Sequence, residues 1–170
     1  MARPAVDSPL FRRDVLRRIV EDTLNAPHFP HDKVQEALRA DRDVHARLPA
    51  LSERDRLVVE EACQVLAMYR STQAPDTSDQ DRLYALQLQY TQAGCTILLC
   101  DLAGARRMLD MLARELRPRP QSTLSTSIEG MQLNVAVLGT LQWLSGAQDQ
   151  SHDAERYARW RTQVESQLAK

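Results

Sequence analysis

Apolar residues recur every three or four positions along most of this 170-residue chain, and this spacing constrains its fold more than any other feature. An α-helix turns once every 3.6 residues, so side chains three and four apart fall on one face. Leu83, Leu86 and Tyr90 show the spacing clearly. The chain has only 5 glycines, too few for the many turns of an all-β fold. The pattern therefore predicts an all-α protein.

Residues that start or stop helices divide the pattern into segments. Serine, threonine and aspartate side chains accept hydrogen bonds from the free N–H groups of a first turn, and proline interrupts a helix. Starts are expected at Ser8, Asp32, Ser52 and Thr126, and breaks at Pro27, Pro49, Pro75 and Pro118. Loops are expected near residues 26–31, 72–79, 117–125 and 145–150, and the second helix is expected to run from Asp32 to Leu48. We expect one helical domain over residues 1–170, with residues 1–7 flexible and about six to seven helices arranged as a bundle or as stacked hairpins.

Two apolar segments lack the clear helical spacing of the rest of the chain. From Met131 to Leu144 almost every residue is apolar or small, so we expect a helix buried at the centre of the fold. Residues Thr96–Asp101 could form either the end of a helix or a strand, because short apolar runs do not separate the two. The helical alternative is favoured, with a bend or a tight turn near Gly104, since too few other strands are available to build a sheet.

Residues Asp101–Leu109 resemble the turn and second helix of a tetratricopeptide unit, in which a small residue lets two antiparallel helices approach closely. Ala105 supplies this small residue, and Ala93 fits the preceding helix. The preceding helix departs from the pattern at Gln89 and Gln92, and no repeat of the unit is visible elsewhere. The resemblance implies stacked helical hairpins over this part of the chain.

The charge balance argues against a nucleic-acid or membrane partner. The chain carries 22 Lys and Arg against 23 Asp and Glu, so its net charge is −1 and no overall field attracts polyanions. Lys33 and Lys170 are the only lysines, an arginine bias that we attribute to a GC-rich bacterial genome. No apolar stretch approaches the roughly 20 residues of a membrane span.

The cysteines indicate a reducing compartment. Cys63, Cys95 and Cys100 are odd in number and fall inside helical patterns, which is typical of free thiols and not of a disulfide framework. The N-terminal residues also lack the apolar run of a signal peptide. We therefore expect a cytoplasmic protein.

The motifs favour a binding role over chemistry. No phosphate-binding loop, dinucleotide fingerprint, serine nucleophile motif or zinc-protease motif is present, so no cofactor is expected. We predict an interaction module without catalytic activity, such as an adaptor, chaperone, immunity protein or regulatory subunit, that binds another protein or itself. The expected contact residues are the apolar Phe11, Leu16, Tyr84 and Leu88 and the arginines Arg12, Arg13, Arg17 and Arg18.

One alternative is a metal-dependent hydrolase. His28, His31 and Asp32 form the densest group of metal-ligating side chains, and imidazole with carboxylate suits a divalent cation. The His31-Asp32 pair resembles the one used by metal-dependent phosphohydrolases of helical fold, which would imply further ligands from other helices. The competing interpretation is that Asp32 caps a helix and the histidines are solvated.

A second alternative is a ribonuclease. Arg39 and His45 resemble the arginine–histidine pair of the helical nucleotide-binding ribonucleases of higher eukaryotes and prokaryotes. In that family the pair opens a long helix at a dimer groove, and a cation beside a general acid–base can cleave RNA. Here the pair precedes Pro49, where an arginine also suits a helix C-terminus.

Overall fold

Eight helices make up most of the structure, and no strand occurs among the residues it describes. The computed structural model describes residues 9–40, 42–43, 47–72 and 78–170. In chain order the helices are α1 (Pro9–Asn25), α2 (His31–Leu38), α3 (Glu53–Arg70), α4 (Asp79–Leu98), α5 (Leu102–Glu115), α6 (Thr123–Thr126), α7 (Ile128–Ala147) and α8 (Ser151–Leu168). The predicted all-α fold is confirmed, and the helix that was not expected is the single turn α6.

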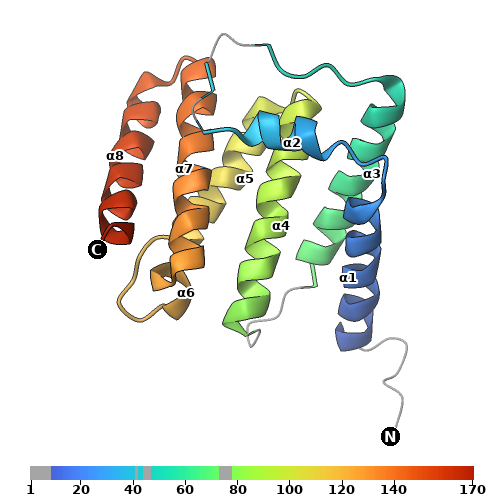
Figure 1. The fold of residues 1–170 in the computed structure, drawn as a ribbon, viewed down its shortest axis with the longest axis horizontal. Coiled ribbons are helices and arrows are strands. Elements are labelled where there is room, and N and C mark those ends of the chain that lie inside the picture. The colour runs from blue at the N-terminus through green and yellow to red at the C-terminus, as the bar shows by residue number, and fades with distance from the viewer. Residues whose placement is uncertain (1–8, 41, 44–46, 73–77) are drawn as a thin grey trace, which may run out of the picture.

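The long helices that follow each other in the chain are also neighbours in space. α1 packs on α3, α3 on α4, α4 on α5, α5 on α7, and α7 on α8. Figure 1 shows the long helices side by side, with α1 at one end of the row, α8 at the other, and the short α2 lying across α4. The bundle is thus a stack of helical hairpins, and α1 and α8 are its end helices.

The segment Thr96–Asp101, for which a strand was an alternative, forms the last turn of α4 and a tight turn into α5. The Thr96 hydroxyl donates to the Gln92 carbonyl at 2.8 Å, as it does in a helix. Cys100 then adopts φ 65°, a left-handed conformation that reverses the chain. The Asp101 side chain accepts from Gly104 N at 2.9 Å and caps α5. The strand alternative is wrong, because both ends of the connection are closed by helical caps.

The main core lies between α4, α5 and α7. Side chains without measurable exposure include Ala93, Cys95 and Ile97 of α4, Ala105, Leu109 and Leu112 of α5, and Val137, Leu141 and Leu144 of α7. The prediction that Met131–Leu144 is a buried helix is confirmed. α7 is buried around most of its circumference, so it also carries polar groups such as Asn134 and Thr140 into the interior.

The second helix ends at Leu38, well before the predicted end at Leu48. The Leu38 carbonyl accepts from the Thr140 hydroxyl of α7 at 2.6 Å, and the Glu36 carbonyl accepts from the buried Arg42 side chain at 3.1 Å. A helix that continued would instead satisfy these carbonyls with its own N–H groups. Partners from elsewhere in the fold therefore end α2.

The predicted helix starts have mixed outcomes. Ser52 caps α3, as expected, by accepting from Asp55 N at 3.1 Å. Asp32 is not a cap, because α2 already begins at His31 and has no side-chain cap. Thr126 ends α6, and the neighbouring Ser127 starts α7 instead by accepting from Gly130 N at 3.0 Å. The predicted start at Ser8 lies outside the described residues.

The expected loops correspond broadly to the connections between helices. α6 occupies part of the loop expected at 117–125, and α7 continues to Ala147, into the loop expected at 145–150. Residues 1–7 and most of the loop at 72–79 lie outside the part of the chain that the structure describes.

Candidate functional site

Leu16 and Leu88, two of the apolar residues expected on a contact surface, are buried. They are 8% and 7% exposed and form a small core with Val20, Leu66 and Tyr69 between α1, α3 and α4. Leu16 and Val20 are one turn apart on the side of α1 that faces the bundle. These leucines hold α1 in place and are not open to a partner, which corrects the expectation for both.

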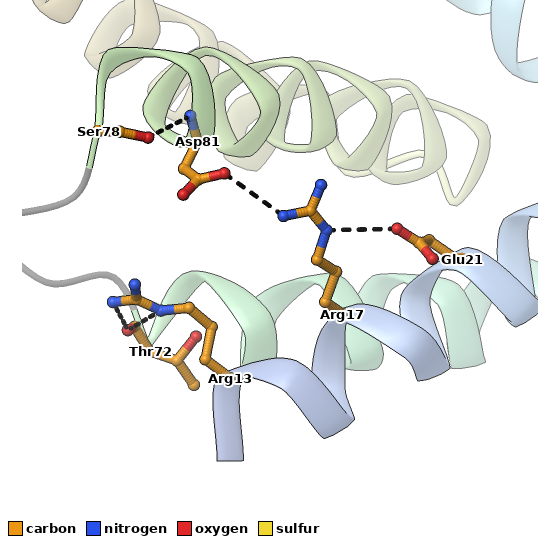
Figure 2. A network of polar contacts seen from close by, with 6 residues as sticks. All are labelled: Arg13, Arg17, Glu21, Thr72, Ser78 and Asp81. Atoms are coloured by element: carbon orange, nitrogen blue, oxygen red, sulfur yellow. Dashed lines mark hydrogen bonds and ion pairs between the residues drawn. The ribbon is translucent and has the colours of Figure 1, made fainter. Parts of the chain in front are cut away.

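Tyr84, another expected contact residue, is half-buried beneath Arg17. The Arg17 guanidinium lies 4.4 Å from the centre of the Tyr84 ring, within the range of a cation–π interaction. Figure 2 shows the same guanidinium between two carboxylates, with Nε 3.3 Å from Glu21 and Nη1 3.4 Å from Asp81. Burial and the charge of Glu21 raise the pKa of the Tyr84 hydroxyl. Arg17 therefore links α1 to the first turn of α4.

Arg13 is also engaged within the molecule. Its Nε and Nη2 atoms donate to the Thr72 carbonyl at 3.2 and 2.8 Å, just after α3 ends (Figure 2). A guanidinium that makes two hydrogen bonds to one backbone carbonyl stabilises a helix end. Arg13 and Arg17 thus fasten α1 to its neighbours, and the predicted basic patch retains Arg12 and Arg18 as exposed residues.

Among the α1 residues whose side chains the structure describes, the exposed large apolar ones are Val15 and Ile19, which are one turn apart and each 42% exposed. Five residues share this side of the helix, and we call them the outer α1 face: Arg12, Val15, Arg18, Ile19 and Asp22. At 100° per residue they span about a third of the circumference, with Arg12 and Arg18 at its two edges. The backbone of Phe11 belongs to α1, but its side chain lies outside what the structure describes.

The other end helix shows the opposite character on its outer side. The exposed stripe of α8 consists of Glu155, Arg159, Thr162 and Ser166, all of them polar. A polar outer face on a terminal helix is what keeps stacked helical arrays soluble. The outer α1 face departs from this rule, because it carries two exposed apolar side chains in its middle.

Sequence reasoning named Arg12 and Arg18 of this surface but missed Val15 and Ile19, because α1 carries two adjacent apolar stripes. One contains Val15 and Ile19, and the other contains Leu16, Val20 and Leu24. Both stripes have helical spacing, and spacing alone does not identify the one that packs on the bundle.

The candidate metal ligands are not gathered into a site. His28, His31 and Asp32 are all exposed, while Phe29 between them is buried and lies 4.7 Å from the His31 ring, measured between ring centres. Among the described residues, no three His, Cys, Asp or Glu side chains are placed to share a metal ion. The segment between α1 and α2 is held by the burial of Phe29.

The candidate ribonuclease pair is only partly described. Arg39 is the exposed C-cap of α2 and lies 3.9 Å from Glu36, whereas His45 falls outside the described residues. The family arrangement has the pair opening a long helix, and Arg39 instead follows the end of one.

Within the described residues, none of the helices has both the length and the apolar character that crossing a membrane requires. Comparison of the chain with protein-family models, curated proteins and solved structures finds no match.

Proposed function

We propose that this protein is a non-catalytic interaction module that binds a partner protein through the outer α1 face. The partner element is an amphipathic helix whose apolar stripe is bordered on both sides by Asp or Glu. The exposed Val15 and Ile19, bordered by Arg12 and Arg18 on an end helix of the stack, are the observation that supports this most directly. An adaptor, chaperone, immunity protein or regulatory subunit of the bacterial cytoplasm would act in this way.

The apolar pair supplies the affinity in this proposal. Fully burying a Val or Ile side chain contributes about 1.5–3 kcal/mol, and each of these two still has 42% of its surface to cover. A partner helix that packs i, i+3 and i+4 side chains against them would gain on the order of 1 kcal/mol from each.

The two arginines supply specificity. Exposed ion pairs contribute about 0.2–1 kcal/mol each, so Arg12 and Arg18 select and orient the partner more than they hold it. Two arginines at opposite edges favour an acidic residue on each border of the partner stripe. A second copy of this chain is a poorer partner, because antiparallel α1 helices would bring the two Arg18 side chains close together.

The proposal can be tested with two synthetic amphipathic helices that share a leucine stripe, one bordered by Glu and the other by Lys. Fluorescence anisotropy with the purified protein should show binding of the Glu peptide and at least tenfold weaker binding of the Lys peptide. Raising the salt concentration should weaken binding of the Glu peptide, because the border charges are exposed.

The matched variants are Ile19→Glu on α1 and Leu57→Glu on α3, because both positions carry an exposed large apolar side chain. We expect Ile19→Glu to lower affinity at least tenfold and Leu57→Glu to leave it unchanged. Equal binding of both peptides, or equal loss in both variants, would contradict the proposal. Light scattering that shows a stable dimer broken by Ile19→Glu would replace the partner helix with a second copy.

A further inference from the structure

Two cysteine thiols meet where α3 packs on α4. Cys63 lies on α3 and Cys95 lies in the last turn of α4, and these helices are side by side in the bundle (Figure 1). The two thiols share a hydrogen bond, and Cys63 Sγ also lies 4.0 Å from the hydroxyl oxygen of Thr96, the residue next to Cys95. Both cysteines are free. The two sulfur atoms are therefore in contact across the helix interface without a covalent bond.

The two thiols differ in their access to solvent. Cys95 has no measurable exposure and belongs to the main core, whereas Cys63 is half-buried at the edge of that core. A small solute therefore approaches the pair from the side of Cys63.

The two thiols also differ in how readily they lose a proton. The hydrogen bond with Cys95 lowers the pKa of Cys63, and the same bond together with burial raises the pKa of Cys95. The thiolate is the nucleophilic form of cysteine, so Cys63 is the thiol suited to attack and Cys95 is the one that waits beside it.

We propose that Cys63 and Cys95 form a reversible disulfide when the protein meets hydrogen peroxide. In the first step the Cys63 sulfur attacks one peroxide oxygen: an S–O bond forms, the O–O bond breaks, and the other oxygen leaves as water with the Cys63 proton. In the second step the Cys95 sulfur attacks the Cys63 sulfenic acid: the S–S bond forms, the S–O bond breaks, and the hydroxyl leaves as water with the Cys95 proton. The two sulfurs are oxidised and the peroxide is reduced, so two thiols and one peroxide give one disulfide and two waters.

The contact between the sulfurs favours the second step over the competing reactions. A resolving thiol that already touches the attacking one needs no search, and it reacts before a second peroxide can carry the sulfenic acid further. The bond would tie α3 to α4 beside the main core and restrict the unfolded chain. The pair shares no residue with the outer α1 face, so this inference is independent of the proposed partner contact.

The test uses the full chain with Cys100→Ser, which removes the exposed third thiol. The protein is treated with hydrogen peroxide, free thiols are blocked with N-ethylmaleimide, and trypsin then separates the two cysteines by cleaving after Arg70 and Arg82. Mass spectrometry should recover most of the oxidised Cys63 linked to Cys95, and dithiothreitol should restore both thiols. Oxidised Cys63 recovered as a sulfinic acid beside a free Cys95 would overturn the inference.

Two further changes in the Cys100→Ser protein test the role of each thiol. In Cys95→Ala the Cys63 sulfenic acid has no partner, so dimedone should trap it, and the absence of an adduct would mean that Cys63 does not attack. In Cys63→Ser the loss of free Cys95 to peroxide should be slower by about tenfold or more, because the buried thiol then has to react directly. Equal loss of Cys95 with and without Cys63 would overturn the inference, and this half-buried substitution decides even if Cys95→Ala does not fold.

Discussion

Cys63, Cys95 and Cys100 occupy three different environments. Cys100 is exposed in the turn after α4, Cys63 is half-buried with its sulfur 4.0 Å from Thr96 Oγ1, and Cys95 is fully buried. The hydrogen bond between the Cys95 and Cys63 thiols, together with burial, raises the pKa of Cys95, and the same hydrogen bond lowers the pKa of Cys63. The thiolate is the reactive form of cysteine, so the three side chains should differ in reactivity.

We predict that iodoacetamide modifies Cys100 first and Cys95 last in the native protein. Exposure favours Cys100, whereas Cys95 is both inaccessible and hard to deprotonate. Mass spectrometry of peptides taken over a time course measures the order directly. In denaturant the three rates should converge, and a native Cys95 that reacts as fast as Cys100 would contradict the packing described for α4.

Val15 and Leu16 show why burial could not be read from residue type. They are adjacent in α1, yet one is 42% exposed and the other 8% exposed. One residue turns the helix by 100°, so neighbouring apolar side chains point to different surroundings. Contact with α3 and α4 determines which stripe of α1 is buried, because these helices cover one stripe and leave the other in solvent.

The start of α7 illustrates capping at the scale of an element. Ser127 Oγ accepts from Gly130 N at 3.0 Å and donates to the Leu124 carbonyl at 2.8 Å, so one hydroxyl joins the end of α6 to the start of α7. Thr126, the start expected from sequence, directs its hydroxyl back to the Ser122 carbonyl at 2.9 Å. Serine and threonine are both good N-cap residues, so residue type alone does not show which of these two neighbours caps α7.

Replacing Ser127 with alanine should therefore destabilise the protein by about 1 kcal/mol, because the first turn of α7 loses its cap. Thr126→Ala is the matched control, since this exposed hydroxyl caps nothing, and it should change stability by less than about 0.5 kcal/mol. Urea unfolding followed by circular dichroism gives both values. A larger loss from Thr126→Ala than from Ser127→Ala would mean that the helix starts one residue earlier.

At the scale of the whole molecule, one buried hydroxyl network joins three helices. The Thr140 hydroxyl of α7 donates to the Leu38 carbonyl at the end of α2 and lies 2.9 Å from the Tyr90 hydroxyl of α4. With the Thr140 proton on Leu38, the Tyr90 hydroxyl donates to Thr140, and burial raises the pKa of Tyr90, which keeps this proton in place. The network holds α2 across α4. It contacts α2 at Leu38, which is the last residue of that helix.

Thr140→Val keeps the shape of the side chain and removes the hydroxyl, so we predict a loss of about 1–3 kcal/mol in unfolding free energy. The exposed Thr162→Val of α8 is the control, with an expected change within about 0.5 kcal/mol. Hydrogen exchange should show that Thr140→Val reduces protection in α2 more than in α8. Uniform loss of protection in both helices would indicate that the network does not act on α2 in particular.

The sequence by itself determined that this protein is helical, where most helices stop, and that Met131–Leu144 is buried. Helical spacing, prolines and caps such as Ser52 act through residues close in the chain, so they can be recognised without the fold. Only the tertiary structure decided the features that depend on distant partners. These are the end of α2 at Leu38 and the exposed stripe of α1. Each of these features depends on which helix packs against the residue concerned, and the spacing of residues along the chain does not specify that neighbour.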